Sequence, residues 1–73
     1  MLKTFTLQGD NPAQMKEAVE KITAYLRENT PEGVVSKQLL PNSWSIQAYV
    51  TEAQTIEVEK MAQAHDLKIT ISR

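Results

Sequence analysis

His65 is the only histidine in the sequence, and histidine is the residue type that most readily exchanges a proton near neutral pH. A metal site on a helix would need a second ligand three or four residues away, but those positions hold Ala62 and Met61. The neighbouring Asp66 does not share a helix face with His65. We therefore expect His65 to cap or line the C-terminal end of a helix.

Carboxylates are the other side chains that could carry chemistry, and Glu52, Glu57 and Glu59 fall within one predicted helix. Their spacing spreads them around the helix axis, so they do not converge on one point. The sequence has no cysteine, which excludes thiolate nucleophiles and thiolate metal sites. We predict no catalytic residue, no metal and no cofactor, and hence a protein that is not an enzyme.

Asp10 and Asn11 stand directly before a predicted helix that starts with Pro12. Free amides at a helix N-terminus attract phosphate and carboxylate groups, which makes this loop a candidate ligand site. The carboxylate of Asp10 would repel such a ligand, and Asn11 is a favourable N-cap residue. Ordinary capping is therefore the favoured interpretation, with a small-ligand loop as the alternative.

Trp44 and Tyr49 belong to one predicted strand, and their odd spacing places them on opposite faces of it. They cannot form one platform for stacked bases. Trp44 shares its face with Ile46, Ala48 and Val50, so we expect it in the core. Tyr49 stands among serine and glutamine residues, where an exposed aromatic side chain can mark a contact surface.

The overall composition limits the partners that the protein could have. Eight Lys and Arg residues against nine Asp and Glu residues give a net charge of −1, which offers no field to gather nucleic-acid backbones. No segment is apolar for long enough to span a bilayer, and residues 1–8 lack the apolar run of a signal peptide. With 41% hydrophobic residues, we expect one globular domain over residues 1–73 in the cytoplasm.

Two regularly spaced segments occupy the first half of the chain. β-Favouring and polar residues alternate from Met1 to Gln8, which predicts a strand. A helix is predicted from Pro12 to about Asn29, where Asn29 can adopt the left-handed cap and Pro31 prevents further helix. The apolar face of this helix repeats every three or four residues: Met15, Ala18, Val19, Ile22, Tyr25 and Leu26.

The second half has the same number of helices but begins with a hairpin. Residues 34–40 have apolar ends and a polar centre without clean alternation, which predicts a bulged edge strand. A turn at residues 41–42 then leads into a central strand over residues 44–50. Thr51 and Gln54 match a capping box that starts a helix ending near His65. Ile56 points away from the apolar side of this helix, so either Ile56 is exposed or the helix has another phase. A last strand covers residues 67–72.

This β-α-β-β-α-β order is the split β-α-β arrangement. Right-handed crossovers predict an α+β sandwich, with a four-stranded antiparallel sheet of order 4-1-3-2 and two helices on one face. Over nearly the whole chain the pattern resembles the ferredoxin-like fold, which hosts many unrelated functions. The largely buried residues should be Phe5, Leu7, Val19, Ile22, Leu26, Trp44, Ile46, Met61, Ile69 and Ile71.

Motifs of individual ferredoxin-like families are mostly missing. The loop over residues 9–12 lacks the cysteine pair of metal-carrying domains and the arginine of acylphosphatases. The outward sides of the first and third strands lack the aromatic platform of RNA-recognition motifs. The sequence from Asp10 to Ala13 is loosely similar to a turn of ACT domains but lacks its glycine. That last likeness implies a small-ligand-sensing role as an alternative.

We expect a small interaction or regulatory module without catalytic activity. One face of the predicted sheet carries no helix, and its neutral side chains lose water more cheaply than ions when a partner covers them. The partner would be a second copy, through this face or the edge strand, or a different protein; a ligand sensor and a single-stranded nucleic-acid binder are the alternatives. The predicted interaction surface comprises Thr4, Thr6, Val35, Gln47, Tyr49 and Thr70.

The isolation of His65 generates a first prediction. The wild-type protein and a His65→Ala variant should bind Zn²⁺ equally weakly, because no second ligand supports the imidazole. Isothermal titration of both proteins with Zn²⁺ measures this. Stoichiometric binding that is lost in the variant would contradict the interpretation.

Overall fold

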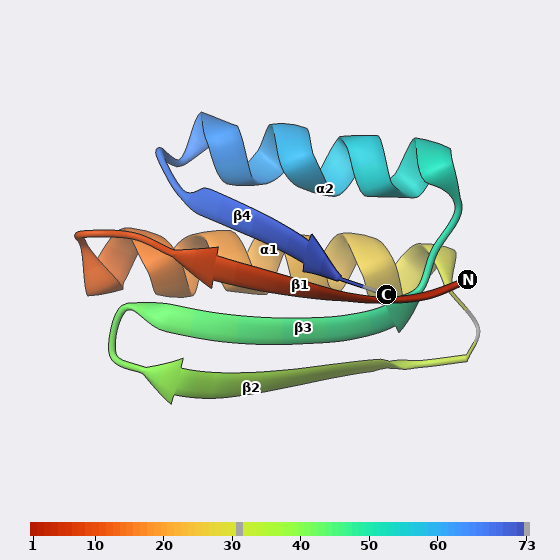
Figure 1. The fold of residues 1–73 in the computed structure, drawn as a ribbon, viewed down its shortest axis with the longest axis horizontal. Coiled ribbons are helices and arrows are strands. Elements are labelled where there is room, and N and C mark those ends of the chain that lie inside the picture. The colour runs from red at the N-terminus through yellow and green to blue at the C-terminus, as the bar shows by residue number, and fades with distance from the viewer. Residues whose placement is uncertain (31, 73) are drawn as a thin grey trace.

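The fold is a sheet of four strands with two helices, as described by a computed structural model that covers residues 1–30 and 32–72 (Figure 1). Pro31 lies outside the described residues. The strand order is β2-β3-β1-β4 with antiparallel pairing, which is the predicted order counted from the opposite edge. In chain order the elements are β1 (Leu2–Gln8), α1 (Pro12–Asn29), β2 (Val34–Leu40), β3 (Ser43–Tyr49), α2 (Glu52–Ala64) and β4 (Lys68–Ser72).

The first helix begins as predicted and ends differently. Asn11 is its N-cap, and the side-chain Oδ1 of Asn11 accepts hydrogen bonds from the backbone amides of Ala13 and Gln14 at 3.0 and 3.3 Å. The left-handed cap predicted at Asn29 is wrong, because Asn29 is still helical and Thr30 follows with an extended backbone, at φ −129°. The Thr30 hydroxyl donates to the Leu26 carbonyl at 2.8 Å, which satisfies a helix end without any left-handed residue.

The second helix carries the predicted capping box. The Gln54 amide donates to the Thr51 hydroxyl at 3.2 Å, and the Thr51 amide donates to the Gln54 side chain at 2.9 Å. At the other end, the amides of Asp66 and Leu67 donate to the carbonyls of Gln63 and Ala62. This is a Schellman motif, in which Asp66 adopts φ 57°, a conformation that glycine would occupy with less strain.

The register of the sheet puts apolar side chains of neighbouring strands together. Phe5 on β1 lies opposite Ile46 on β3 and opposite Ile71 on β4. On β2 the register shifts between Gln38 and Leu40, which confirms the predicted bulge on this edge strand. In Figure 1 α1 passes behind β1 and β4 and α2 lies beyond β4, so no helix crosses the front face of the sheet.

One core fills the space between the sheet and the helices. Six of the predicted core residues are buried, whereas Trp44, Met61, Ile69 and Ile71 are only partly buried and pack against its margin. Ile56 is 51% exposed, in agreement with its predicted position outside the apolar side of α2. The buried hydrophobic residues are Phe5, Leu7, Met15, Ala18, Val19, Ile22, Leu26, Ile46, Ala48, Val50, Val58, Ala62 and Leu67.

The contrast between buried and exposed isoleucines gives a second prediction. Ile22→Ala and Ile46→Ala should each lower the free energy of unfolding by about 2–5 kcal/mol, because both side chains are fully buried and leave a cavity. Ile56→Ala makes the same chemical change at an exposed helical position and should change the free energy of unfolding by less than about 0.5 kcal/mol. Urea unfolding of the three variants compares them. Equal losses at all three sites would show that the assigned core is wrong.

Candidate functional site

The uncovered front face of the sheet, called the open face below, holds the residues predicted to form an interaction surface. Gln47 lies opposite Thr4 on one side and opposite Val35 on the other, and its side-chain amide donates to the Thr4 hydroxyl at 3.4 Å. Side chains alternate along each strand, so residues that lie directly opposite each other on neighbouring strands point to the same face of the sheet. The structure brings together Thr4, Thr6, Val35, Gln47, Tyr49 and Thr70 on the open face.

Charge is distributed unevenly on the open face. None of the four strands contains Asp or Glu. Lys37 lies on the edge strand β2 and Lys68 on the edge strand β4, whereas the central strands β1 and β3 present only neutral side chains to this face. A neutral centre with charge at its margin is the usual anatomy of a protein contact surface.

Leu2 joins two of the predicted surface residues, Tyr49 and Val35, in an apolar corner of the open face, and Leu2 was not singled out from the sequence. Leu2 lies opposite Tyr49, and both are exposed, at 39% and 48%. Val35, at 64% exposed, joins them from β2, and the three side chains line a hollow of about 350 Å³ that Glu32 borders from the preceding turn. The alternation of β1 did place Leu2 on the same side as Thr4, but only the pairing of strands shows which apolar residues become neighbours.

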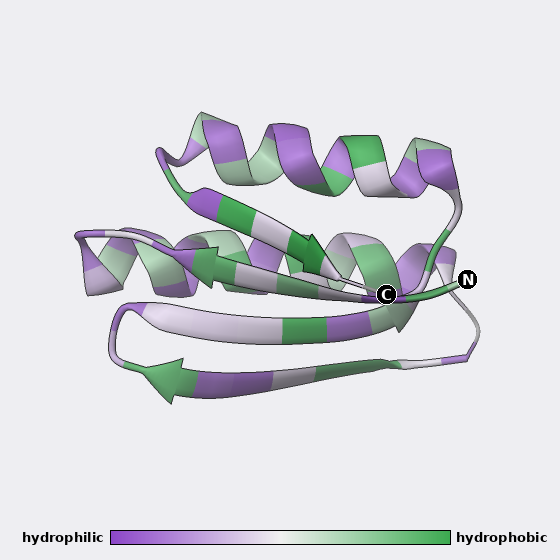
Figure 2. Cartoon of the chain, viewed as in Figure 1, coloured by the Kyte–Doolittle hydropathy of each residue, from purple (hydrophilic) through white to green (hydrophobic). Residues whose placement is uncertain are grey.

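The outer edge of β2 is protected against strand pairing. Figure 2 shows the hydrophilic middle of this strand between apolar ends, and Lys37 occupies that middle. A lysine and a bulge on an edge strand both discourage a second chain from adding to the sheet. Of the two contact modes predicted from the sequence, the open face is therefore favoured over the edge.

Asn11 of the candidate ligand loop caps the first helix, as the favoured interpretation predicts. Asn11 uses its side-chain oxygen to accept from the first amides of α1, and its own carbonyl accepts from the Met15 amide at 3.0 Å. Those amides are therefore already bonded. Asp10 is exposed beside a polar hollow of about 330 Å³ that Asp66 and Lys68 also line.

His65 is the C-cap residue of α2 and is partly buried. Its ring Nδ1 lies 3.0 Å from the Met61 carbonyl oxygen, so the tautomer that carries a hydrogen on Nδ1 donates to an otherwise free carbonyl of the last helical turn. Among the described residues, no three His, Cys, Asp or Glu side chains are grouped so that they could hold a metal ion.

A buried lysine is the main polar feature that the sequence did not reveal. Lys3 is only 5% exposed on the helix side of β1, and its Nζ lies 2.9 Å from Oε1 of Glu52 and 3.1 Å from the Thr55 hydroxyl. Lys3 lines none of the surface hollows described for residues 1–30 and 32–72. The ammonium group therefore joins β1 to the start of α2 and does not face a ligand site.

These features define a ferredoxin-like α+β protein with a neutral open sheet face. A scan against protein-family models finds no match, and neither does a search of curated proteins. Within the described part of the chain, neither helix has the length and apolar character needed to cross a membrane.

The Lys3 contact gives a third prediction. Glu52→Gln should lower the free energy of unfolding by about 1 kcal/mol, because the buried Lys3 ammonium loses its negatively charged partner and keeps only neutral hydrogen-bond acceptors. Glu57→Gln, whose exposed carboxylate lies 3.9 Å from Lys60, should change it by less than about 0.5 kcal/mol.

Lys3→Met completes this comparison, since it replaces the ammonium by an apolar chain of similar length. This variant should be at least as stable as the wild type. Thermal and urea unfolding of all three variants measures the differences. A large loss of stability for Lys3→Met would show that the ion pair is a net stabilising element.

Proposed function

We propose that the protein is a non-catalytic interaction module that self-associates by packing its open face against the open face of a second copy. The observation that carries this proposal is the neutral centre of the open face, bordered by Lys37 and Lys68 and extended by the apolar corner of Leu2, Val35 and Tyr49.

Desolvation favours contact at the centre of this face. Hydroxyl and amide side chains lose far less hydration free energy than ions when they are covered, and they can exchange hydrogen bonds with the same groups on a second copy. The two lysines stand on edge strands, so their flexible side chains can keep their ammonium groups in water at the rim. Stacked sheets of this kind pack about 10 Å apart.

The size of the face sets the strength of the contact. Four strands spaced about 4.8 Å apart, with up to seven residues of about 3.3 Å each, give a face of roughly 400 Å² per copy. Roughly 800 Å² in total is below the standard size of about 1,600 Å² for a stable complex. The self-association is therefore weak, and it depends strongly on protein concentration.

A regulatory role fits such an association, because a weak dimer responds to changes in the amount of protein. A different protein with a neutral, flat surface would use the same face. Self-association is favoured over a different partner, since the face offers matching hydroxyl and amide groups to its own copy and the strands contain no acidic side chain.

Sedimentation equilibrium over micromolar to millimolar concentrations gives the fourth prediction. The wild type should change from monomer to dimer within this range. Tyr49→Lys should weaken the dimer by about tenfold or more, because it places a cation in the apolar corner. Ile56→Lys is the matched control: Ile56 is equally exposed, at 51% against 48% for Tyr49, but it lies on α2. This variant should leave the dimer unchanged.

A protein that remains monomeric at all concentrations would contradict self-association. Equal weakening by Tyr49→Lys and Ile56→Lys would show that the dimer uses another surface. In either case the open face would remain available only to a different protein.

A further inference from the structure

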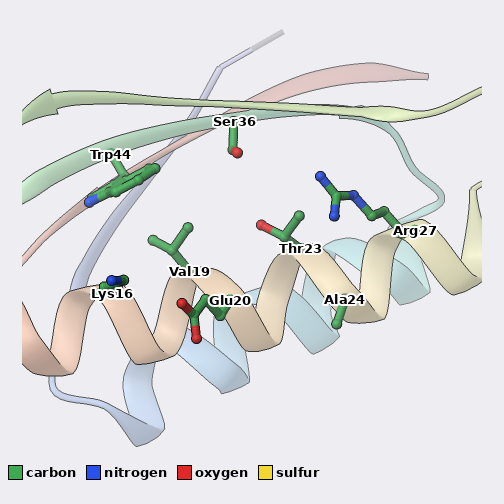
Figure 3. A pocket seen from close by; sticks show the side chains of 8 residues that line it. All are labelled: Lys16, Val19, Glu20, Thr23, Ala24, Arg27, Ser36 and Trp44. Carbon is green, nitrogen blue, oxygen red and sulfur yellow. The ribbon is translucent and has the colours of Figure 1, made fainter.

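A groove runs between α1 and the edge of the sheet, on the side opposite to the open face. In Figure 1 no helix overlaps β2, and only Val34 of this strand packs against the core, so the helix side of β2 beyond Val34 is exposed. The groove has a volume of about 400 Å³, within the range of small-molecule sites. Its walls come from α1, β2 and β3, and Figure 3 shows the lining residues: Lys16, Val19, Glu20, Thr23, Ala24, Arg27, Ser36 and Trp44.

The groove contains a buried hydroxyl group without a partner. Thr23 is only 7% exposed, and its Oγ1 forms no hydrogen bond with any described residue. Figure 3 shows this oxygen on the groove side of α1, turned toward Val19 and Trp44. A buried hydroxyl without a hydrogen-bond partner destabilises a protein. A ligand that forms a hydrogen bond with the Thr23 hydroxyl would explain why this group is present.

The positive charges of the groove are also unpaired. Lys21 on the same helix forms an ion pair with Glu17 at 3.2 Å, whereas Lys16 and Arg27 form none with the described residues. In Figure 3 the Arg27 guanidinium reaches from the helix toward the sheet and closes one end of the groove. The Glu20 carboxylate points away from the sheet, so it does not neutralise this end.

The apolar surfaces lie toward the other end. The ring of Trp44 and the side chain of Val19 face each other across the groove in Figure 3. Trp44 is only partly buried and is the single tryptophan of the chain, so an open aromatic surface is available there. An aromatic ring in a ligand can pack against it.

We infer that this groove binds a small aromatic carboxylate. Its ring packs against the exposed part of Trp44, and its carboxylate receives the paired N–H groups of Arg27, the geometry in which guanidinium and carboxylate bind best. The hydroxyls of Thr23 and Ser36 lie between these two ends, where the Thr23 hydroxyl donates a hydrogen bond to the carboxylate of the ligand. This site is independent of the open face and of self-association.

Phenylacetate is a suitable probe, and phenylacetamide is its neutral counterpart. Titration followed by amide and indole NMR signals should show phenylacetate binding with a dissociation constant of about 1 mM, with shifts at Trp44, Thr23 and Ser36. Phenylacetamide should bind about tenfold more weakly. Shifts confined to other regions, or no shift at about 10 mM phenylacetate, would overturn the inference.

Two substitutions separate the site from general charge effects. Arg27→Gln should weaken phenylacetate binding by about tenfold. Lys21→Gln removes one positive charge from the same helix outside the groove and should leave binding unchanged. Equal effects of the two variants would mean that only net charge matters, which overturns the site.

Thr23→Val tests the buried hydroxyl while keeping its shape. The variant should melt at the same or a higher temperature than the wild type, because it removes an unsatisfied group, yet it should bind phenylacetate several-fold more weakly. Unchanged binding in a stably folded Thr23→Val protein would contradict a ligand role for this hydroxyl.

Discussion

Phe5 and Ile46 lie opposite each other on the two central strands, and both are completely shielded from water by the helices. This pair lies at the middle of the core, and the other elements pack around it so that water is excluded from it. Two helices of 18 and 13 residues cover one face of the sheet, but their length and number leave most of β2 exposed and the whole open face uncovered. The exposed surfaces of the protein are therefore a direct consequence of its small size.

Polar contacts hold the elements in register around this core. Lys3 binds Glu52 and Thr55, so the first strand is tied to the first turn of α2 across 49 residues of chain. The caps at Asn11 and Thr51 fix where each helix starts. A core this small gains little from apolar burial alone, and such caps each add about 1 kcal/mol.

The two uncovered regions differ in chemistry, and this difference decides what each can bind. The open face has a neutral centre and an apolar corner, which suits a flat protein surface. The groove beside β2 combines an aromatic wall with unpaired cations and a buried hydroxyl, which suits a small anion. The lysine and the bulge of β2 stand between them and limit growth of the sheet past its edge.

Local sequence patterns were sufficient for the secondary structure and the topology. The alternation of β1 and β3, the spacing of the apolar residues in α1 and the Thr51 capping box each depend on residues close together in the chain, so each could be recognised without the fold. The same patterns placed the six interaction-surface residues on one face of the sheet. The bulge in β2 was predicted for the same reason, since its irregular alternation is local.

Features that depend on distant residues were decided by the tertiary structure alone. The alternation of β1 puts Lys3 on the core side, but its burial depends on Glu52 and Thr55 arriving from α2 to satisfy the ammonium. The cap at Asn29 was wrong because Thr30 satisfies the helix end with its own hydroxyl.

The groove required three segments, α1, β2 and β3, to come together, and Thr23 looked like any polar residue on a helix until the sheet closed over it. The sequence by itself determined which elements form and in what order they pair. Which side chains lose water, and which remain without a partner, was fixed only when the helices packed on the sheet, because burial is a property of the assembled surfaces and not of any single segment.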